Sequence, residues 1–134
     1  MENQVKHLLI ILSILLLSSP VIGDNHKGET LYQWGECCDG YVWKGFGDEK
    51  THPKYEGDIK NGKPNGFGIL IFTNGIKYVG EWKDGREHGQ GTDIFLDGSK
   101  GIGEFRKGTP WNITHRDKNG NIIVKFVNGK QIKE

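Results

Sequence analysis

The most reactive side chains in this 134-residue chain belong to two adjacent cysteines, Cys37 and Cys38. Consecutive Cα atoms lie only ~3.8 Å apart, whereas disulfides prefer a Cα separation of ~5.5–6 Å. Three states are therefore open to the pair: a strained vicinal disulfide, pairing between molecules, or two unmodified thiols. If the pair has a function, we expect it to be a redox switch formed by Cys37 and Cys38. The chain has no second cysteine pair, so these residues predict no metal site.

Histidine is the other residue type here that is suited to acid–base or metal chemistry. No pair of histidines has a ligand spacing, and no Ser/His/Asp order, paired-carboxylate motif or phosphate loop is present. Gly45-Phe46-Gly47 and Gly101-Ile102-Gly103 resemble fragments of a dinucleotide loop, but they precede no predicted helix. We therefore predict no catalytic residue, metal, cofactor or small-molecule substrate. The histidines beyond residue 23, which we expect to face solvent, are His26, His52, His88 and His115.

The first 23 residues have the composition of a cleaved signal peptide. A basic start precedes the apolar run Leu8–Leu17, and short residues up to Gly23 resemble a cleavage site. Counted on to Ile22, the apolar stretch has 15 residues and includes serines and a proline, whereas a membrane-spanning helix needs ~20. We expect cleavage after Gly23 and export to the periplasm or the extracellular space. The alternative is an uncleaved leader that anchors the chain in a membrane.

The charge balance argues against nucleic acid as a partner. Residues 1–23 hold one of the 18 basic and one of the 17 acidic residues, so the remainder carries 17 and 16, a net charge of +1. Nucleic-acid-binding domains normally carry a basic stripe, and so small a net charge also predicts no strong attraction to an anionic membrane. The segment Asn112-Ile113-Thr114 is a glycosylation sequon, which matters only in a host that glycosylates exported proteins.

A 23-residue repeat organises the rest of the chain. Residues 55–77 (YEGDIKNGKPNGFGILIFTNGIK) and residues 78–100 (YVGEWKDGREHGQGTDIFLDGSK) align without gaps and are identical at ten positions. Divergent copies flank them, and terminal repeats are expected to be atypical because they cap the array. We predict a flexible linker at 24–31 and one repeat domain at 32–134. Its flanking copies are a degenerate copy at 32–54, a divergent copy at 101–123 and a half-copy at 124–134.

Regularly spaced glycines mark the predicted turns. Most follow Asn or Asp, and these pairs favour type I′ hairpin turns, which need positive φ at both central residues. Lys107-Gly108 fills one turn position without this signal, and an unmarked turn is expected near residues 48–50. The glycines at predicted turns are Gly62, Gly75, Gly85, Gly98, Gly108, Gly120 and Gly129.

Between the turns, the residues alternate with the two-residue period of a strand. In residues 77–83 this alternation places Tyr78, Gly80 and Trp82 on one face of the sheet, where the glycine leaves a slot that a neighbouring ring can cover. The other face is expected to be solvated, with opposite charges that pair across strands. The predicted aromatic row consists of Tyr32, Tyr55, Tyr78, Trp82, Phe105 and Phe126. The charge columns on the other face are Asp58, Glu81 and Glu104, beside Lys60, Lys83 and Arg106.

The pattern Y-x-G-x-W-x-x-G-x-x-x-G-x-G at residues 78–91 resembles the MORN repeat. The copy that begins at Tyr55 is similar to it, with Ile59 in place of tryptophan. The resemblance implies an all-β fold of tandem antiparallel hairpins stacked into an elongated, twisted, single-layer sheet, here preceded by an N-terminal signal helix. It also implies an interaction or scaffolding module, with membrane-lipid contact as a further proposed role of the family. The copy at 101–123 departs from the pattern because it lacks the second glycine pair.

Together these features predict an exported, non-enzymatic scaffold that binds another protein or its own copies through a face or edge of the sheet. A single-layer sheet has no second layer to cover the aromatic row, so we expect part of this row to stay exposed, although its rings would also pack on one another. The alternative function is a peripheral envelope-membrane protein, tethered by its leader or shallowly inserted through the rings. The candidate interaction residues are Tyr55, Tyr78, Trp82, Phe105 and Phe126.

Overall fold

The computed structural model describes residues 29–37 and 40–132. The predicted signal helix, the first part of the predicted linker and Cys38 lie outside the described residues. The described residues contain strands and turns but no helix, and therefore no helical segment that could span a bilayer.

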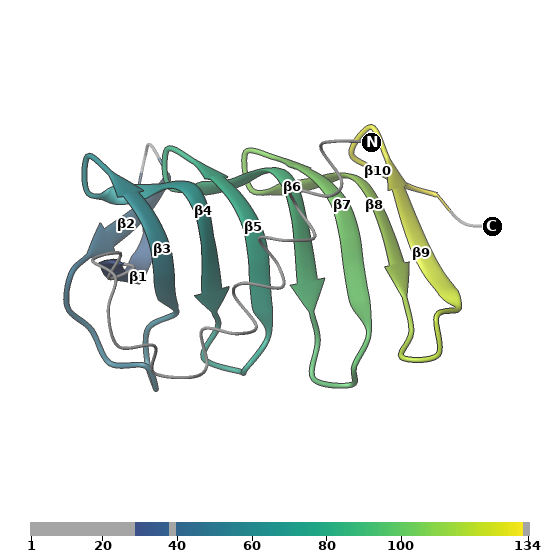
Figure 1. Cartoon of the computed structure of the whole chain (residues 1–134), viewed down its shortest axis with the longest axis horizontal. Helices are drawn as coiled ribbons and strands as arrows, with labels where there is room; N and C mark the ends of the chain where they lie inside the picture. The colour runs from purple at the N-terminus through teal and green to yellow at the C-terminus, as the bar shows by residue number, and fades with distance from the viewer. Residues whose placement is uncertain (1–28, 38–39, 133–134) are drawn as a thin grey trace, which may run out of the picture.

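Ten antiparallel strands form one open sheet, as the all-β prediction requires (Figure 1). From β3 to β10, each strand pairs with its neighbours in the chain, which is the predicted stack of hairpins. The strands are β1 (Glu29–Cys37), β2 (Gly40–Lys44), β3 (Lys54–Lys60), β4 (Lys63–Ile71), β5 (Lys77–Lys83), β6 (Arg86–Ile94), β7 (Lys100–Arg106), β8 (Thr109–Arg116), β9 (Ile122–Val127) and β10 (Lys130–Ile132).

All seven predicted glycine turns lie between consecutive strands. Four of them are two-residue turns whose first residue has positive φ: Asn61 at 54°, Asp84 at 51°, Lys107 at 50° and Asn128 at 52°. Each is followed by a glycine that also has positive φ, as a type I′ turn requires. Lysine rarely adopts this left-handed conformation, so Lys107 is the strained member of the series.

The N-terminal hairpin departs from the simple stack. The strand order is β3-β1-β2, so β1 pairs with β3 and the later strand β2 forms the sheet edge. Strand β1 begins at Glu29, inside the segment predicted as linker. The turn expected near residues 48–50 is present, because the amide of Thr51 donates to the carbonyl of Asp48 at 2.9 Å. It joins β2 to β3, which are not neighbours in the sheet.

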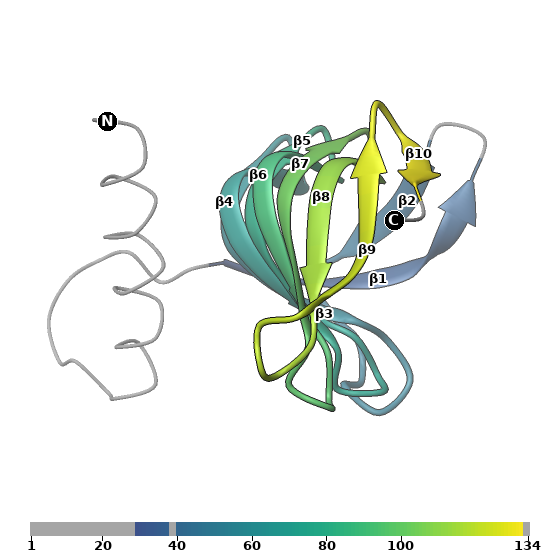
Figure 2. The ribbon, with the colours of Figure 1, turned by 90° about the vertical axis from the view of Figure 1, so that its right-hand side faces the viewer.

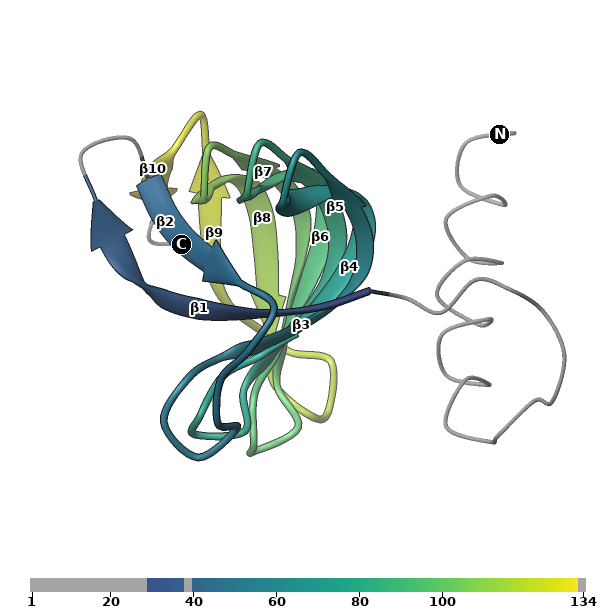
Figure 3. The ribbon, with the colours of Figure 1, turned by 90° about the vertical axis from the view of Figure 1, so that its left-hand side faces the viewer.

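The strands curve along their length, so one face of the sheet is concave (Figures 2 and 3). The aromatic row is buried on this inner face. Strand β2 crosses towards this inner face, and Trp43 packs edge-on against Tyr55 and Trp82, with ring centroids 5.9 Å apart in both pairs. Curvature and this folded-over hairpin together replace the missing second layer. The core that results contains Leu31, Tyr55, Leu70, Tyr78, Trp82, Phe105 and Ile113.

Candidate functional site

The structure places most of the candidate interaction residues in the core. Tyr55 and Tyr78 are at most 1% exposed, Trp82 is 4% and Phe105 is 3% exposed, and Phe126 is partly buried against them. The expectation that part of this row stays open is therefore wrong for the first four residues. A single layer that stayed open would leave the row exposed, whereas the curved sheet encloses it.

Tyr32 does not belong to the aromatic row. Leu31 pairs with Tyr55 in the β1–β3 register and fills the core position. Because successive side chains on a strand point to opposite faces, Tyr32 faces the other way and packs against Gly47 instead. The degenerate first copy is thus shifted by one residue from the phase that its tyrosine suggests.

The repeated tyrosines have a structural role. The hydroxyl of Tyr55 donates to the carbonyl of Asp58 at 2.7 Å, and that of Tyr78 donates to the carbonyl of Glu81 at 2.9 Å. Burial raises the pKa of both hydroxyls well above the ordinary value, so neither ionises near neutral pH. Each ring lies over a glycine of the next strand, Gly68 or Gly91. This glycine pairs with the central glycine of the tyrosine's own strand, Gly57 or Gly80, where the slot was predicted.

The third copy exchanges the two partners of this contact. Gly101 takes the place of the tyrosine, and Ile113 takes the place of the glycine that the ring covers. A Cβ added to Gly101 would lie 3.4 Å from Cγ2 of Ile113, so the isoleucine fills the space a ring would occupy. Ile113 is 4% exposed. The divergence of residues 101–123 thus preserves the packing.

The acidic column binds backbone amides rather than forming the predicted ion pairs across strands. Asp58 accepts from the amide of Phe67 at 2.9 Å, and Glu81 accepts from the amide of Gln90. These bonds lie where the strand register shifts between Gly57 and Ile59 and again one repeat later. Glu104 instead pairs with Arg106 on its own strand, at 2.7 Å.

Neighbouring hairpins are joined by a second repeated set of bonds. The amide of Asp84 donates to Oδ1 of Asn65 at 3.3 Å, and the amide of Asn128 donates to Oδ1 of Asn112 at 2.9 Å. In the copy between them, Nδ1 of His88 accepts from the amide of Lys107 at 3.4 Å. His88 and the sequon residue Asn112 therefore both contribute to the stacking of the repeats.

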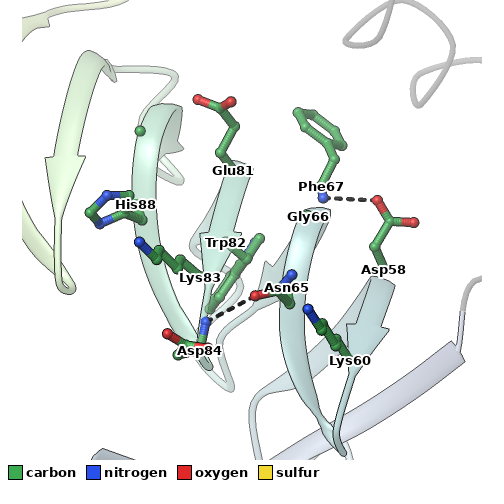
Figure 4. Close-up of a pocket in the computed structure, with 11 residues that line it drawn as sticks. Asp58, Lys60, Asn65, Gly66, Phe67, Glu81, Trp82, Lys83, Asp84 and His88 are labelled. Atoms are coloured by element: carbon green, nitrogen blue, oxygen red, sulfur yellow. Dashed lines mark hydrogen bonds between the residues drawn. The ribbon is translucent and has the colours of Figure 1, made fainter.

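A shallow pocket of about 690 Å³ lies between the two full repeats (Figure 4). Its charges are mixed, since Asp58, Glu81 and Asp84 accompany Lys60 and Lys83. Two of these carboxylates already accept backbone amides, and the lining includes no serine, threonine or cysteine. The pocket therefore resembles a groove between stacked hairpins rather than a catalytic centre. Its lining consists of Asp58, Lys60, Asn65, Gly66, Phe67, Glu81, Trp82, Lys83, Asp84, His88 and Gly89.

Two partly buried carboxyl groups, those of Glu87 and Asp93, were not predicted from the sequence. Burial raises the pKa of Glu87 to about 6 and that of Asp93 to about 6. Oε2 of Glu87 is buried without a hydrogen-bond partner among the described residues. The signal was in the repeat itself: Glu87 and Asp93 stand 23 residues after Pro64 and Leu70, both fully buried.

Two hydroxyl–imidazole pairs among the described residues could suggest a nucleophile and a base. In the exposed turn before β3, Oγ1 of Thr51 lies 2.8 Å from Nδ1 of His52. The other pair, Ser99 and His115, is partly buried. Oγ of Ser99 lies 3.2 Å from Nε2 of His115. Ser99 is only 3% exposed, however, and Asp97 accepts from its amide at 2.9 Å rather than orienting the imidazole. This arrangement stabilises the turn between β6 and β7 and offers no access to a substrate.

The remaining candidate residues are not brought together. Cys37 ends β1, paired with Gly40, and Cys38 and His26 lie outside the described residues. The His52 ring packs on Trp34 with centroids 4.0 Å apart. Within residues 29–37 and 40–132, no three His, Cys, Asp or Glu side chains are grouped closely enough to hold a metal ion.

The comparisons with known proteins agree with the repeat boundaries. Residues 55–77 and 78–100 each match the family model of the MORN repeat, over the same spans as the two full copies identified from the sequence. No curated protein matches the chain.

Proposed function

Because the chain is a MORN repeat protein, we propose that it is an exported, non-catalytic scaffold that binds through the two open edges of its sheet. Among the described strands, β2 and β10 each have a hydrogen-bonded neighbour on one side only. Such edges present unpaired N–H and C=O groups to which another strand can add. This observation carries the proposal, since the aromatic face is already occupied by the core.

Strand direction favours binding between copies of the chain. Nine antiparallel pairings separate β2 from β10, so these two strands run in opposite directions. A second copy displaced along the sheet, without rotation, therefore brings its β2 antiparallel to β10 of the first. Such head-to-tail contacts do not close and generate a linear assembly.

Charge favours the same arrangement. Residues 29–60 carry seven acidic and four basic side chains, whereas residues 100–132 carry two acidic and seven basic ones. Head-to-tail contact joins these opposite ends, while a two-fold contact between identical edges joins like charges. The protein partner best supported is thus another copy of this chain.

Light scattering across a concentration series tests the proposal. The average mass should rise with concentration at low salt and fall at high salt, because salt screens the attraction between the ends. Ile132→Glu, at the β10 edge, should lower the mass, because it places an acidic side chain where the acidic end of the next copy must bind. Thr73→Glu, in an exposed turn, adds the same charge and should not. A monomer at every concentration and salt level, with no partner cross-linked through either edge, would contradict edge binding.

The alternative of shallow membrane insertion loses its support, since four of the five rings that would insert are buried. The tethered alternative concerns residues 1–23, which lie outside the described residues. The intact mass of the chain from its native host tests it: a chain that begins at Asp24 is exported without an anchor, and a full-length chain in the membrane fraction is tethered.

A further inference from the structure

The outer face of the sheet carries two neighbouring rows without an acidic residue between β4 and β9. Strand register aligns the residues of each row, and both rows lie opposite the buried aromatic row. The first row is Ile71, Lys77, Ile94, Lys100, Arg116 and Ile122. The second is Ile69, Val79, Thr92, Ile102, Thr114 and Lys125.

The cations of the first row are available to a ligand. Lys77, Lys100 and Arg116 are exposed. The ammonium groups of Lys77 and Lys100 make no hydrogen bond or ion pair with any described residue, and Arg116 donates to the carbonyl of Gly120 at 3.0 Å. Two strand spacings separate Lys77 on β5 from Lys100 on β7, a distance of roughly 9–10 Å. The row is therefore a straight line of unneutralised positive charges across the strands.

From this arrangement we propose that the row centred on Lys77 and Lys100 binds a linear acidic polysaccharide with about one anionic group per disaccharide. An extended disaccharide is about as long as two strand spacings, so successive anionic groups reach successive lysines. Between the lysines, Ile94 presents an apolar surface to the C–H face of a sugar ring. This ligand contacts the outer face and is independent of the edge binding proposed above.

The shape of the sheet favours a polymer over a membrane. The strands curve strongly along their own length, whereas they follow one another in a line (Figures 1 and 2). The outer face is thus convex in one direction and straight in the other. A flat bilayer would meet it only along a line, while a rod-shaped polymer can lie along the whole row. A nucleic-acid strand carries its phosphates much closer together than these lysines.

A second pair of lysines provides a matched control. Lys60 and Lys83 also stand 23 residues apart and on alternate strands, β3 and β5. They lie beside Asp58, Glu81 and Asp84 in the mixed-charge pocket. Replacing either pair with glutamine removes the same charge at the same spacing. The two variants differ because Lys77 and Lys100 stand in rows without an acidic residue, whereas Lys60 and Lys83 stand beside three acids.

The test is equilibrium binding of the purified protein to immobilised hyaluronate, which carries one carboxylate per disaccharide. Binding should weaken as salt rises. The double variant K77Q/K100Q should bind roughly tenfold more weakly, at about threefold for each exposed ion pair, whereas K60Q/K83Q should bind as the wild type does. All four lysines are exposed, so unfolding midpoints should not change.

Neutral dextran, vesicles rich in phosphatidylserine and single-stranded DNA are the competing probes. Equal losses in the two double variants would overturn the proposal, and so would binding to dextran as tight as to hyaluronate. Tighter binding to vesicles or to DNA would assign the row to a membrane or to nucleic acid instead. The light-scattering result for Ile132→Glu is unaffected by any of these outcomes.

Discussion

Replacement of Gly91 by alanine will destabilise the protein by about 2 kcal/mol. The added Cβ would lie 2.5 Å from Cε2 and 2.6 Å from Cζ of Tyr78, whereas carbon atoms prefer ~3.5–4.0 Å. The ring would have to move by about 1 Å to accommodate it. It has little room, because it is 1% exposed and packs edge-on against Trp82 and Phe105, with centroids at 5.3 and 4.9 Å.

Urea unfolding measures this cost, and a double-mutant cycle identifies its cause. With an m-value of about 2 kcal/mol/M, the midpoint of Gly91→Ala should fall by about 1 M. Tyr78→Leu removes the ring atoms that the methyl group meets, so Gly91→Ala should cost much less in that background. Gly45→Ala is the control, since its Cβ would meet no atom within 4 Å. Equal effects of Gly91→Ala in both backgrounds, or a cost no larger than that of Gly45→Ala, would refute the ring-over-glycine account.

Three further predictions concern the turn, the buried acid and the N-terminal hairpin. Lys107→Asn should stabilise the protein by roughly 0.5–1 kcal/mol, because asparagine tolerates the left-handed conformation better; an unchanged melting temperature would argue against strain at this turn. Burial raises the pKa of Asp93 from its ordinary value of 3.8 to about 6, so this group stabilises the fold most at low pH and loses that contribution as pH rises from 3.8 through 6. Asp93→Asn should therefore raise the unfolding midpoint at pH 7 and leave it nearly unchanged below pH 3.8; an equal effect at both pH values would contradict this assignment. Trp43→Ala should lower the free energy of unfolding by roughly 3 kcal/mol. The backbone amides of β1 and β2 should then lose their protection from hydrogen exchange before those of β5 to β8. A uniform loss of protection would show that the hairpin does not open separately.

Local chemistry explains why the turns and strands could be predicted. A type I′ turn needs two residues with positive φ, and Asn-Gly or Asp-Gly supplies both within a dipeptide. Period-two alternation then assigned Tyr55, Tyr78 and Trp82 to one face, because neighbouring side chains on a strand must point to opposite faces. Even the exception was visible, since Lys107-Gly108 occupied a turn position without the usual asparagine or aspartate.

The candidate site was less accessible to sequence reasoning. Five of the six aromatic residues predicted for the row belong to it, and Tyr32 does not. Their burial depends on strand curvature and on Trp43, whose indole N–H donates to the carbonyl of Gly85, 42 positions further along the chain. Glu87 and Asp93 were missed because the two-residue alternation assigns each side chain to a face of the sheet but does not say how deeply that side chain is buried. The acid-free outer rows appear only when the register of six strands is known.

By itself, the sequence determined the repeat length, the turn positions, the strand phase of the two full copies and the MORN repeats of residues 55–100, all of which depend on residues within one or two hairpins. The tertiary structure decided which face is enclosed, that Leu31 rather than Tyr32 joins the core, and that β1 lies between β3 and β2. It also decided which lysines stand beside acids and which do not. These properties follow from contacts between distant segments, whose free energies depend on the curvature of the whole sheet and cannot be read from any one repeat.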